Sequence, residues 1–355
     1  MRAELSNAQG GRPTKNERRE QAREQARQLR EEAKKRERRN RVLLQSGIIV
    51  AVIAIALVIT LVIINNVRPA GPGPANMASG GVLYVSDGNG GIKVQPTAGL
   101  PDGADPVPSQ PTAQVHIQEF IDLACPVCQQ FEIGLDYDGD GHVSQDELDQ
   151  YNERNGTNVT DDPSTLDDFV GNLDYIETLV KQGVASVELF PVAIVDRSYT
   201  GSKFASRAAN AAACIVANDP EDFLEFTKLM YQQQPQEGSA GMDDAQILSI
   251  AEQAGAGSDV IQQCIKDQSY KNWVAAMTSR ATSWGYDFEA SAKEYSETNG
   301  QGLFGTPTVI VNGQYYAPTG GYPSNSSFKS FILQIAGDTD ATPSPTPSAT
   351  PTPTP

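Results

Sequence analysis

Histidine and cysteine are scarce in this chain, and positive charge is scarce after its first 41 residues. The 355 residues include only 2 His and 4 Cys. A zinc site needs four ligands, and just two of the cysteines stand at the short spacing typical of such sites, so zinc is disfavoured. After residue 41 the chain has 13 Lys/Arg against 37 Asp/Glu. This acidic excess provides no basic stripe for phosphates, which argues against nucleic-acid binding.

The N-terminal region has the opposite charge and leads into an uncharged run. Residues 1–41 hold 14 Lys/Arg and 7 Asp/Glu, and residues 42–64 hold none of either. As a helix, this run would extend roughly 34 Å, which is enough to cross the core of a bilayer. A signal peptide is the alternative, but its apolar region would be shorter, roughly 7–15 residues. We therefore expect a basic cytosolic tail over 1–41 and a single transmembrane helix over 42–65.

The position of the basic residues predicts the orientation of this anchor. The block "KKRERRNR", 34–41, lies directly before the apolar run. Positive charge stays on the cytosolic side, so we expect a single-pass protein of the cell membrane with an extracytoplasmic C-terminal domain. All four cysteines would then lie in a compartment where disulfides persist.

Segments rich in proline and small residues mark the limits of the folded domain. A linker over 66–81 contains "PAGPGPANMASGG", and the end of the chain, "ATPSPTPSATPTPTP", contains six prolines. Such composition favours extended or disordered chain. We therefore expect one folded domain over 82–338 and a disordered Pro/Thr-rich tail over 339–355.

Within this domain, strand-like and helix-like segments alternate. Apolar alternation and a turn at Gly88–Gly91 predict a hairpin at 82–94. Residues 114–124 are typical of a buried strand, and further strands are expected at 185–195 and 304–316. Helical periodicity marks 173–183, the long block 203–285 and 327–337. This order indicates an α/β fold with a helical insertion subdomain over 203–285.

Two cysteines follow directly after the predicted strand 114–124, in "ACPVC". Cys125 would stand at a helix N-terminus, where unpaired N–H groups and the helix dipole favour a thiolate. Pro126 suits the first helical position. Cys128 follows one turn later, close enough to resolve a mixed disulfide. An inert structural disulfide and half of a zinc site are weaker alternatives.

The segments around this pair resemble a known family. "FIDLACPVCQQF", "VELFPVAIVDRSYTGSKFASRAANAAACIVA" and "GTPTVIVNG" are similar to DsbA-like thiol–disulfide oxidoreductases of the thioredoxin superfamily, in their membrane-anchored actinobacterial form. The resemblance covers about 82–132 and 171–335 and implies a thioredoxin-like fold without an organic cofactor. It also implies that Thr306 and Pro307 face the cysteine pair, with the proline cis.

One position departs from the strongly oxidising members of that family, which carry histidine inside the motif. Here the position is Val127, so we expect a less oxidising couple, and the oxidase, isomerase and reductase directions all stay open. The other two cysteines, Cys214 and Cys264, stand in helical segments. In an exported domain we expect them to pair as a structural disulfide, the alternative being two buried thiols.

Seven residues separate Cys128 from a second motif. Residues 136–147 read "DYDGDGHVSQDE", which matches every position of an EF-hand-like calcium loop. The predicted ligands are the side chains of Asp136, Asp138, Asp140 and Glu147, the backbone carbonyl of His142, and Ser144 through water. The family resemblance lapses over 133–170, so the loop belongs to an insert. We expect calcium to be structural, with regulation of substrate access as the alternative.

Two functions from different classes follow from these patterns. The first is a membrane-tethered thiol–disulfide oxidoreductase that acts on exported proteins through Cys125 and Cys128. The resemblance implies a membrane redox partner of the vitamin K epoxide reductase-like type. The second is a calcium-dependent surface binding or adhesion module on a redox-inactive thioredoxin-like scaffold. The coexistence of CPVC with Thr306–Pro307 favours the first.

Overall fold

The structure is a computed structural model that describes residues 71–138, 142–155, 169–283, 285–286, 304–317 and 325–337. The predicted cytosolic tail, transmembrane helix and Pro/Thr-rich tail lie outside these residues. In the part of the chain that is described, no helix combines the length and apolar character that a bilayer crossing requires.

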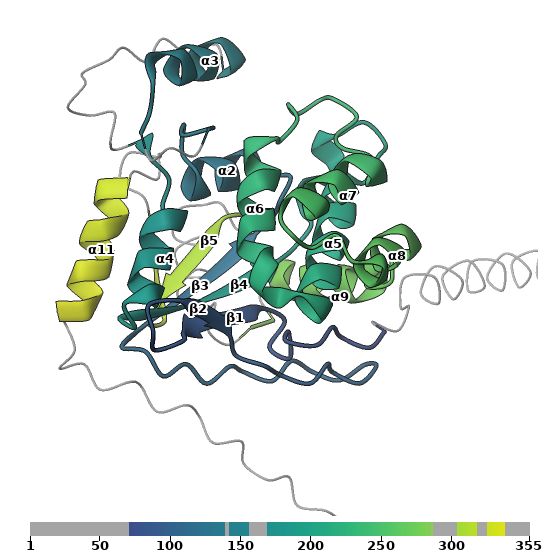
Figure 1. Ribbon diagram of the computed structural model, residues 1–355, viewed down its shortest axis with the longest axis horizontal. Coiled ribbons are helices and arrows are strands. Elements are labelled where there is room, and N and C mark those ends of the chain that lie inside the picture. The colour runs from purple at the N-terminus through teal and green to yellow at the C-terminus, as the bar shows by residue number, and fades with distance from the viewer. Residues whose placement is uncertain are drawn as a thin grey trace, which may run out of the picture. The chain divides into compact units, whose positions relative to one another are not determined.

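A six-stranded mixed sheet forms the centre of the domain (Figure 1). Its strands are β1 (Val82–Ser86), β2 (Ile92–Val94), β3 (Val115–Ile121), β4 (Ala185–Pro191), β5 (Thr308–Val311) and β6 (Gln314–Tyr315). Their order across the sheet is β2-β1-β4-β3-β5-β6. The central strands β3 and β4 are parallel, and the other neighbours are antiparallel. The α/β class that the alternating pattern predicted is therefore confirmed.

The last strand region differs from the sequence prediction. We expected one strand over 304–316, but the structure forms a hairpin of β5 and β6. Asn312 and Gly313 between them have φ values of 47° and 81°. Because left-handed backbone at two successive residues turns the chain sharply, the strand cannot continue through "VNGQ".

The helices cover the sheet and form a separate block (Figure 1). They are α2 (Pro126–Glu132), α3 (Gln145–Asn155), α4 (Leu173–Lys181), α5 (Phe204–Asn218), α6 (Phe223–Gln232), α7 (Asp244–Gln253), α8 (Asp259–Asp267), α9 (Lys271–Thr282) and α11 (Asn325–Gly337). Short 3-10 turns stand at Val195–Ser198 and Pro220–Asp222. In Figure 1, α4 and α11 lie together beside the sheet, and α5 to α9 form the green block. This block corresponds to the predicted subdomain 203–285.

The two faces of the sheet bury different side chains. Ile117 and Val187 point into the main core, together with residues of α2, α4, α5 and α11. Phe120 and Phe190 alternate with them and stack in a second, smaller aromatic cluster, with ring centroids 4.6 Å apart. The strands thus place the residues just after Ile121 at the edge of the main core, where α2 begins.

Candidate functional site

Cys125 caps the start of α2 immediately after β3. Its backbone is extended, and Pro126 takes the first helical position. A proline is tolerated there because its missing N–H would have no partner inside the helix. Cys125 is 5% exposed, Cys128 is fully buried, and both are free thiols. The neighbouring Val127 is 48% exposed, so an apolar side chain lies at the surface beside the pair.

The two thiols have opposite acidities. A hydrogen bond from Cys128 is the main influence that lowers the pKa of Cys125, burial opposes it, and the Thr306 side chain lowers it further. Burial raises the pKa of Cys128 well above its usual range, and its contact with Cys125 adds to the effect. The thiolate is the reactive form of cysteine. Cys125 is therefore suited to act as the nucleophile and Cys128 as the thiol that stabilises it.

The residues at the start of β5 complete this site. The Thr306–Pro307 peptide bond is cis, as the family resemblance implied. The Cys125 Sγ lies 3.5 Å from the Thr306 carbonyl oxygen, which accepts the thiol hydrogen bond. The structure thus brings together all four predicted catalytic-site residues, although 177 positions separate Cys128 from Thr306 along the chain.

Asp122 is a further residue of the site, and our sequence analysis missed it. Its carboxylate is fully buried and accepts hydrogen bonds from the backbone N–H groups of Ala124, Ile194 and Val195, at 3.0, 2.6 and 3.0 Å. Its own backbone N–H donates to the Cys128 Sγ at 3.4 Å. Burial raises the pKa of Asp122 to about 6, although these N–H groups oppose the shift. The available signal was a carboxylate directly after β3 and three residues before Cys125.

Asp122 also affects the dithiol through its charge. The negative carboxylate raises the pKa of both Cys125 and Cys128. Like charges oppose each other's formation, so a thiolate forms less readily while Asp122 is ionised. The acidity of Cys125 therefore depends on a carboxyl group fixed three residues before it.

The other two cysteines lie away from this pair. Cys214 of α5 and Cys264 of α8 form a disulfide whose Cα atoms are 5.8 Å apart. Cys214 is fully buried in the helical block. The bond joins two helices of that block, as a structural crosslink would.

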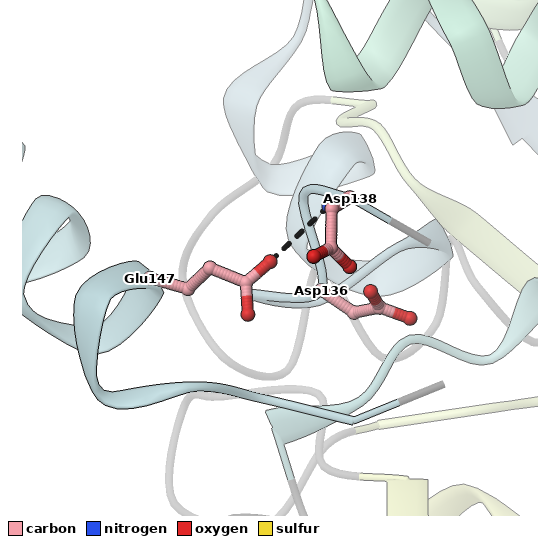
Figure 2. Close-up of side chains that lie close together, drawn as sticks. All are labelled: Asp136, Asp138 and Glu147. Atoms are coloured by element: carbon pink, nitrogen blue, oxygen red, sulfur yellow. Dashed lines mark hydrogen bonds between the residues drawn. The ribbon is translucent and has the colours of Figure 1, made fainter. Parts of the chain in front are cut away.

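The acidic loop brings three of its predicted ligands together (Figure 2). Carboxylate oxygens of Asp136, Asp138 and Glu147 lie within 4.8 Å of one another. One Glu147 oxygen accepts from the N–H of Tyr137 at 2.7 Å and of Asp138 at 3.2 Å. Hard oxygen donors of this kind suit calcium.

The structure describes the other three predicted ligands only in part. Asp140 lies outside the described residues. His142 is exposed. Ser144 contacts the second Glu147 oxygen through its N–H and its hydroxyl, both at 2.8 Å. Within the described loop, Glu147 therefore connects the two ends of the predicted site.

The loop belongs to a small unit with its own core and a narrow neck. Leu135, Val143 and Leu148 form an apolar cluster separate from the main core. At the neck, Gly134 pairs with Val170 in an isolated antiparallel bridge. Gly134 has a φ of 63°, and a Cβ there would overlap the carbonyl oxygen of Phe169. The insert thus leaves the domain just after α2 and returns just before α4.

The chain is similar in part to known proteins. A family model described as "Thioredoxin" matches residues 176–289. No curated protein matches the chain. Among solved structures, reduced DsbA from Mycobacterium tuberculosis is similar, with 20% identity and a TM-score of 0.40, covering 73% of this chain and 93% of that one.

Two further solved structures have similar values. BdbD from Bacillus subtilis has 14% identity and a TM-score of 0.39, covering 76% of this chain and 100% of its own. MdbA from Corynebacterium diphtheriae, titled a thiol–disulfide oxidoreductase, has 15% identity and a TM-score of 0.39, covering 71% and 93%. The chain is thus similar to the thioredoxin model over part of its length, and the solved structures it is similar to include DsbA- and MdbA-type proteins.

Proposed function

We propose that this protein is a thiol–disulfide oxidoreductase that acts through Cys125 and Cys128. The observation that carries the proposal is the opposite acidity of the two thiols at the start of one helix. A structural pair has no need of one thiol with a lowered pKa beside another with a raised pKa. The position of Cys125 beside Thr306 supports the same role, because an incoming peptide can approach that backbone.

The reaction proceeds by two exchanges. The Cys125 thiolate attacks one sulfur of a substrate disulfide, which forms a mixed disulfide and releases the other substrate sulfur as a thiolate. Cys128 then loses its proton and attacks Cys125, which releases the second substrate thiolate and leaves a Cys125–Cys128 disulfide. The substrate is reduced and the protein oxidised. The reverse sequence oxidises a substrate dithiol, and we leave the physiological direction open.

We further propose that the enzyme is tethered to the cell membrane by residues 42–65 and acts on exported proteins. The uncharged run and the basic block before it support this placement. A membrane redox partner would then reset the pair.

Calcium binding by the insert is a separate part of the proposal. Asp136, Asp138 and Glu147 provide the carboxylate oxygens that would hold the ion, with Asp140 as the fourth acidic ligand from the sequence. The ion would neutralise these charges and fix the insert. It takes no part in the exchange steps.

A trapping experiment tests the redox function. The variant Cys128→Ser can form a mixed disulfide but cannot resolve it, so it should accumulate reduction-sensitive adducts on Cys125 with exported proteins. The matched control Cys125→Ser should form none. If Cys128→Ser captures nothing and the wild type neither reduces nor oxidises a test disulfide, the redox-inactive binding module becomes the better interpretation.

A further inference from the structure

The turn that carries the chain from β3 into α2 has three successive backbone carbonyls, which the exchange steps do not use. They belong to Asp122, Leu123 and Ala124, and all three residues are buried. The Cys125 N–H donates to the first of these carbonyl oxygens at 2.9 Å, which closes the turn 122–125. Because a buried carbonyl without a donor is destabilising, the second and third carbonyls need partners from elsewhere in the fold.

Buried side chains from α6 and from segments next to the helical block supply a donor to each carbonyl. The Tyr199 hydroxyl donates to the third carbonyl oxygen at 2.8 Å. The Gln234 Nε2 donates to the second at 3.2 Å, and the Tyr231 hydroxyl donates to the first at 3.4 Å. Among the described residues, no other donor reaches the second and third carbonyls. The path of the chain into Cys125 therefore depends on residues that are distant in the sequence.

The same helical region also contacts the helix that follows the turn. Tyr231 lies on α6, and Gln234 follows the end of α6 by two residues. In Figure 1, α6 lies beside α2, and the Gln129 side chain of α2 donates to the Tyr231 carbonyl oxygen at 2.7 Å. Hydrogen bonds to α6 and its C-terminal end thus fix the chain on both sides of Cys125.

Tyr199 makes the shortest of the three side-chain bonds to the turn. Its hydroxyl also lies 3.2 Å from the Pro235 carbonyl oxygen, but it has one proton, and Ala124 is the nearer acceptor. Burial is the main cause that raises the pKa of Tyr199 and of Tyr231, and the negative charge of Cys125 contributes. Both phenols therefore keep their protons and remain donors while Cys125 titrates.

We propose that Tyr199, Tyr231 and Gln234 are positioning residues, whose hydrogen bonds hold the turn so that the Cys125 sulfur stays at the start of α2. Their donors bond to the carbonyls of the turn, so they act through it. A carbonyl oxygen that loses its donor keeps its partial negative charge, which disfavours a thiolate nearby. The turn would also be free to shift, which moves the sulfur away from the unpaired N–H groups at the helix start. The effect on exchange rests on the proposed function, whereas the hold on the turn does not.

The pH profile of Cys125 alkylation tests this role. Reduced full-length protein would be treated with iodoacetamide over a pH series, and the modification of Cys125 followed by mass spectrometry. We expect the profiles of Tyr199→Phe and Gln234→Met to move to higher pH by about half a pH unit or more, which slows the reaction about threefold on the acid side. Tyr231→Phe should give the smallest shift, because it loses the longest bond.

Tyr84→Phe is the matched control variant. Tyr84 is a buried residue of β1 whose hydroxyl donates to the Pro220 carbonyl oxygen at 2.7 Å, outside the turn. Loss of this bond should destabilise the domain as Tyr199→Phe does, but it should leave the Cys125 profile unchanged. Unchanged profiles in both Tyr199→Phe and Gln234→Met, or an equal shift in the control, would overturn the proposal.

Alkylation also separates this role from the proposed function, because it requires no disulfide exchange. If the wild type lacks exchange activity but the profiles still move, the proposed function fails and the positioning of Cys125 stands. If the wild type is active and the profiles coincide, the positioning role fails alone.

A measurement on the wild type covers variants that fail to fold. Proton NMR should show a slowly exchanging Tyr199 hydroxyl proton with a nuclear Overhauser effect to the 124–125 segment. A Tyr199 hydroxyl proton that exchanges freely with solvent in the folded protein would contradict the bond to the turn and overturn the proposal.

Discussion

The cysteine site and the acidic loop are neighbours in the chain but are built in different ways. Around Cys125, the structure gathers the end of β3, the start of α2, residues 194–195 and the Thr306–Pro307 bond. The acidic loop draws its three assembled carboxylates from residues 136–147 alone, over a separate small core. Chemistry at the first site therefore depends on the whole fold, whereas the second can be changed locally.

The largest expected effect is on exchange activity, which should depend on the cysteine site and not on the acidic loop. Cys125→Ala should abolish exchange with a disulfide-containing test peptide, because no other thiolate is available at the site. Asp138→Asn in the loop should leave that rate unchanged. Parallel stopped-flow assays of the two variants check this, and a loop variant as inactive as Cys125→Ala would show that the regions are not independent.

Removal of the structural disulfide should have the next largest effect, on stability. The bond closes a loop across a sequence separation of 50 residues. Its loss in Cys214→Ala/Cys264→Ala should decrease the free energy of unfolding by about 4 kcal/mol on the loop-entropy estimate. Urea denaturation measures the change. If the folded double variant also lost all thiol–disulfide exchange activity, the Cys214–Cys264 bond would belong to the redox site instead.

Asp122→Asn should change the pH dependence of both stability and thiol reactivity. Because the native pKa of Asp122 is about 6, the unfolded chain loses this proton first. Wild-type stability should decrease by about 3 kcal/mol as the pH rises through this range, and the variant should lack that contribution.

The same variant should increase the acidity of Cys125, because a negative charge beside it is removed. The thiolate ultraviolet absorbance, followed against pH, checks the direction. A shift of the Cys125 titration toward higher pH in Asp122→Asn would contradict the electrostatic role.

A substitution at the neck of the insert should have a smaller effect on stability, confined to the insert. Gly134→Ala meets both a positive φ and the Phe169 carbonyl, so it should destabilise the insert by more than about 1 kcal/mol. Gly201→Ala is the matched control, because its φ is also positive and its Cβ would meet open space. Hydrogen exchange should increase over 135–155 in Gly134→Ala alone, and equal changes in both variants would rule out the neck contact.

Calcium should have the smallest effect on the chemistry. Glu147→Gln should weaken calcium binding measured by calorimetry, because it removes a charged ligand. Chelation should increase proteolysis of the insert without changing the exchange rate. If chelation changes turnover while the fold is retained, calcium regulates the site rather than only fixing the insert.

Much of the fold and the cysteine pair could be predicted from the sequence because their signals are local. The character of a buried strand marked β3, helical periodicity marked α5 to α9, and the CPVC spacing marked the pair. The β5–β6 hairpin was missed although Asn312–Gly313 is a typical two-residue hairpin turn, because β6 is only two residues long and gives no strand pattern of its own.

The buried carboxyl groups could not be recognised in advance. Asp122, Glu119 and Glu132 stand in apolar segments, where a carboxylate can equally face solvent at a strand end or a helix edge. Only the packing of α2 and the 194–195 segment against β3 shows that all three are enclosed. Their burial therefore results from tertiary contacts, which no local sequence pattern indicates.

The asymmetry of the two thiols is the central claim, and competitive alkylation tests it most directly. The reduced full-length protein would be treated with limiting iodoacetamide at neutral pH, and the modified cysteine identified by mass spectrometry. We expect modification of Cys125 first, with Cys128 protected until the protein unfolds. Equal modification of both thiols, or earlier modification of Cys128, would contradict the assignment of Cys125 as the nucleophile.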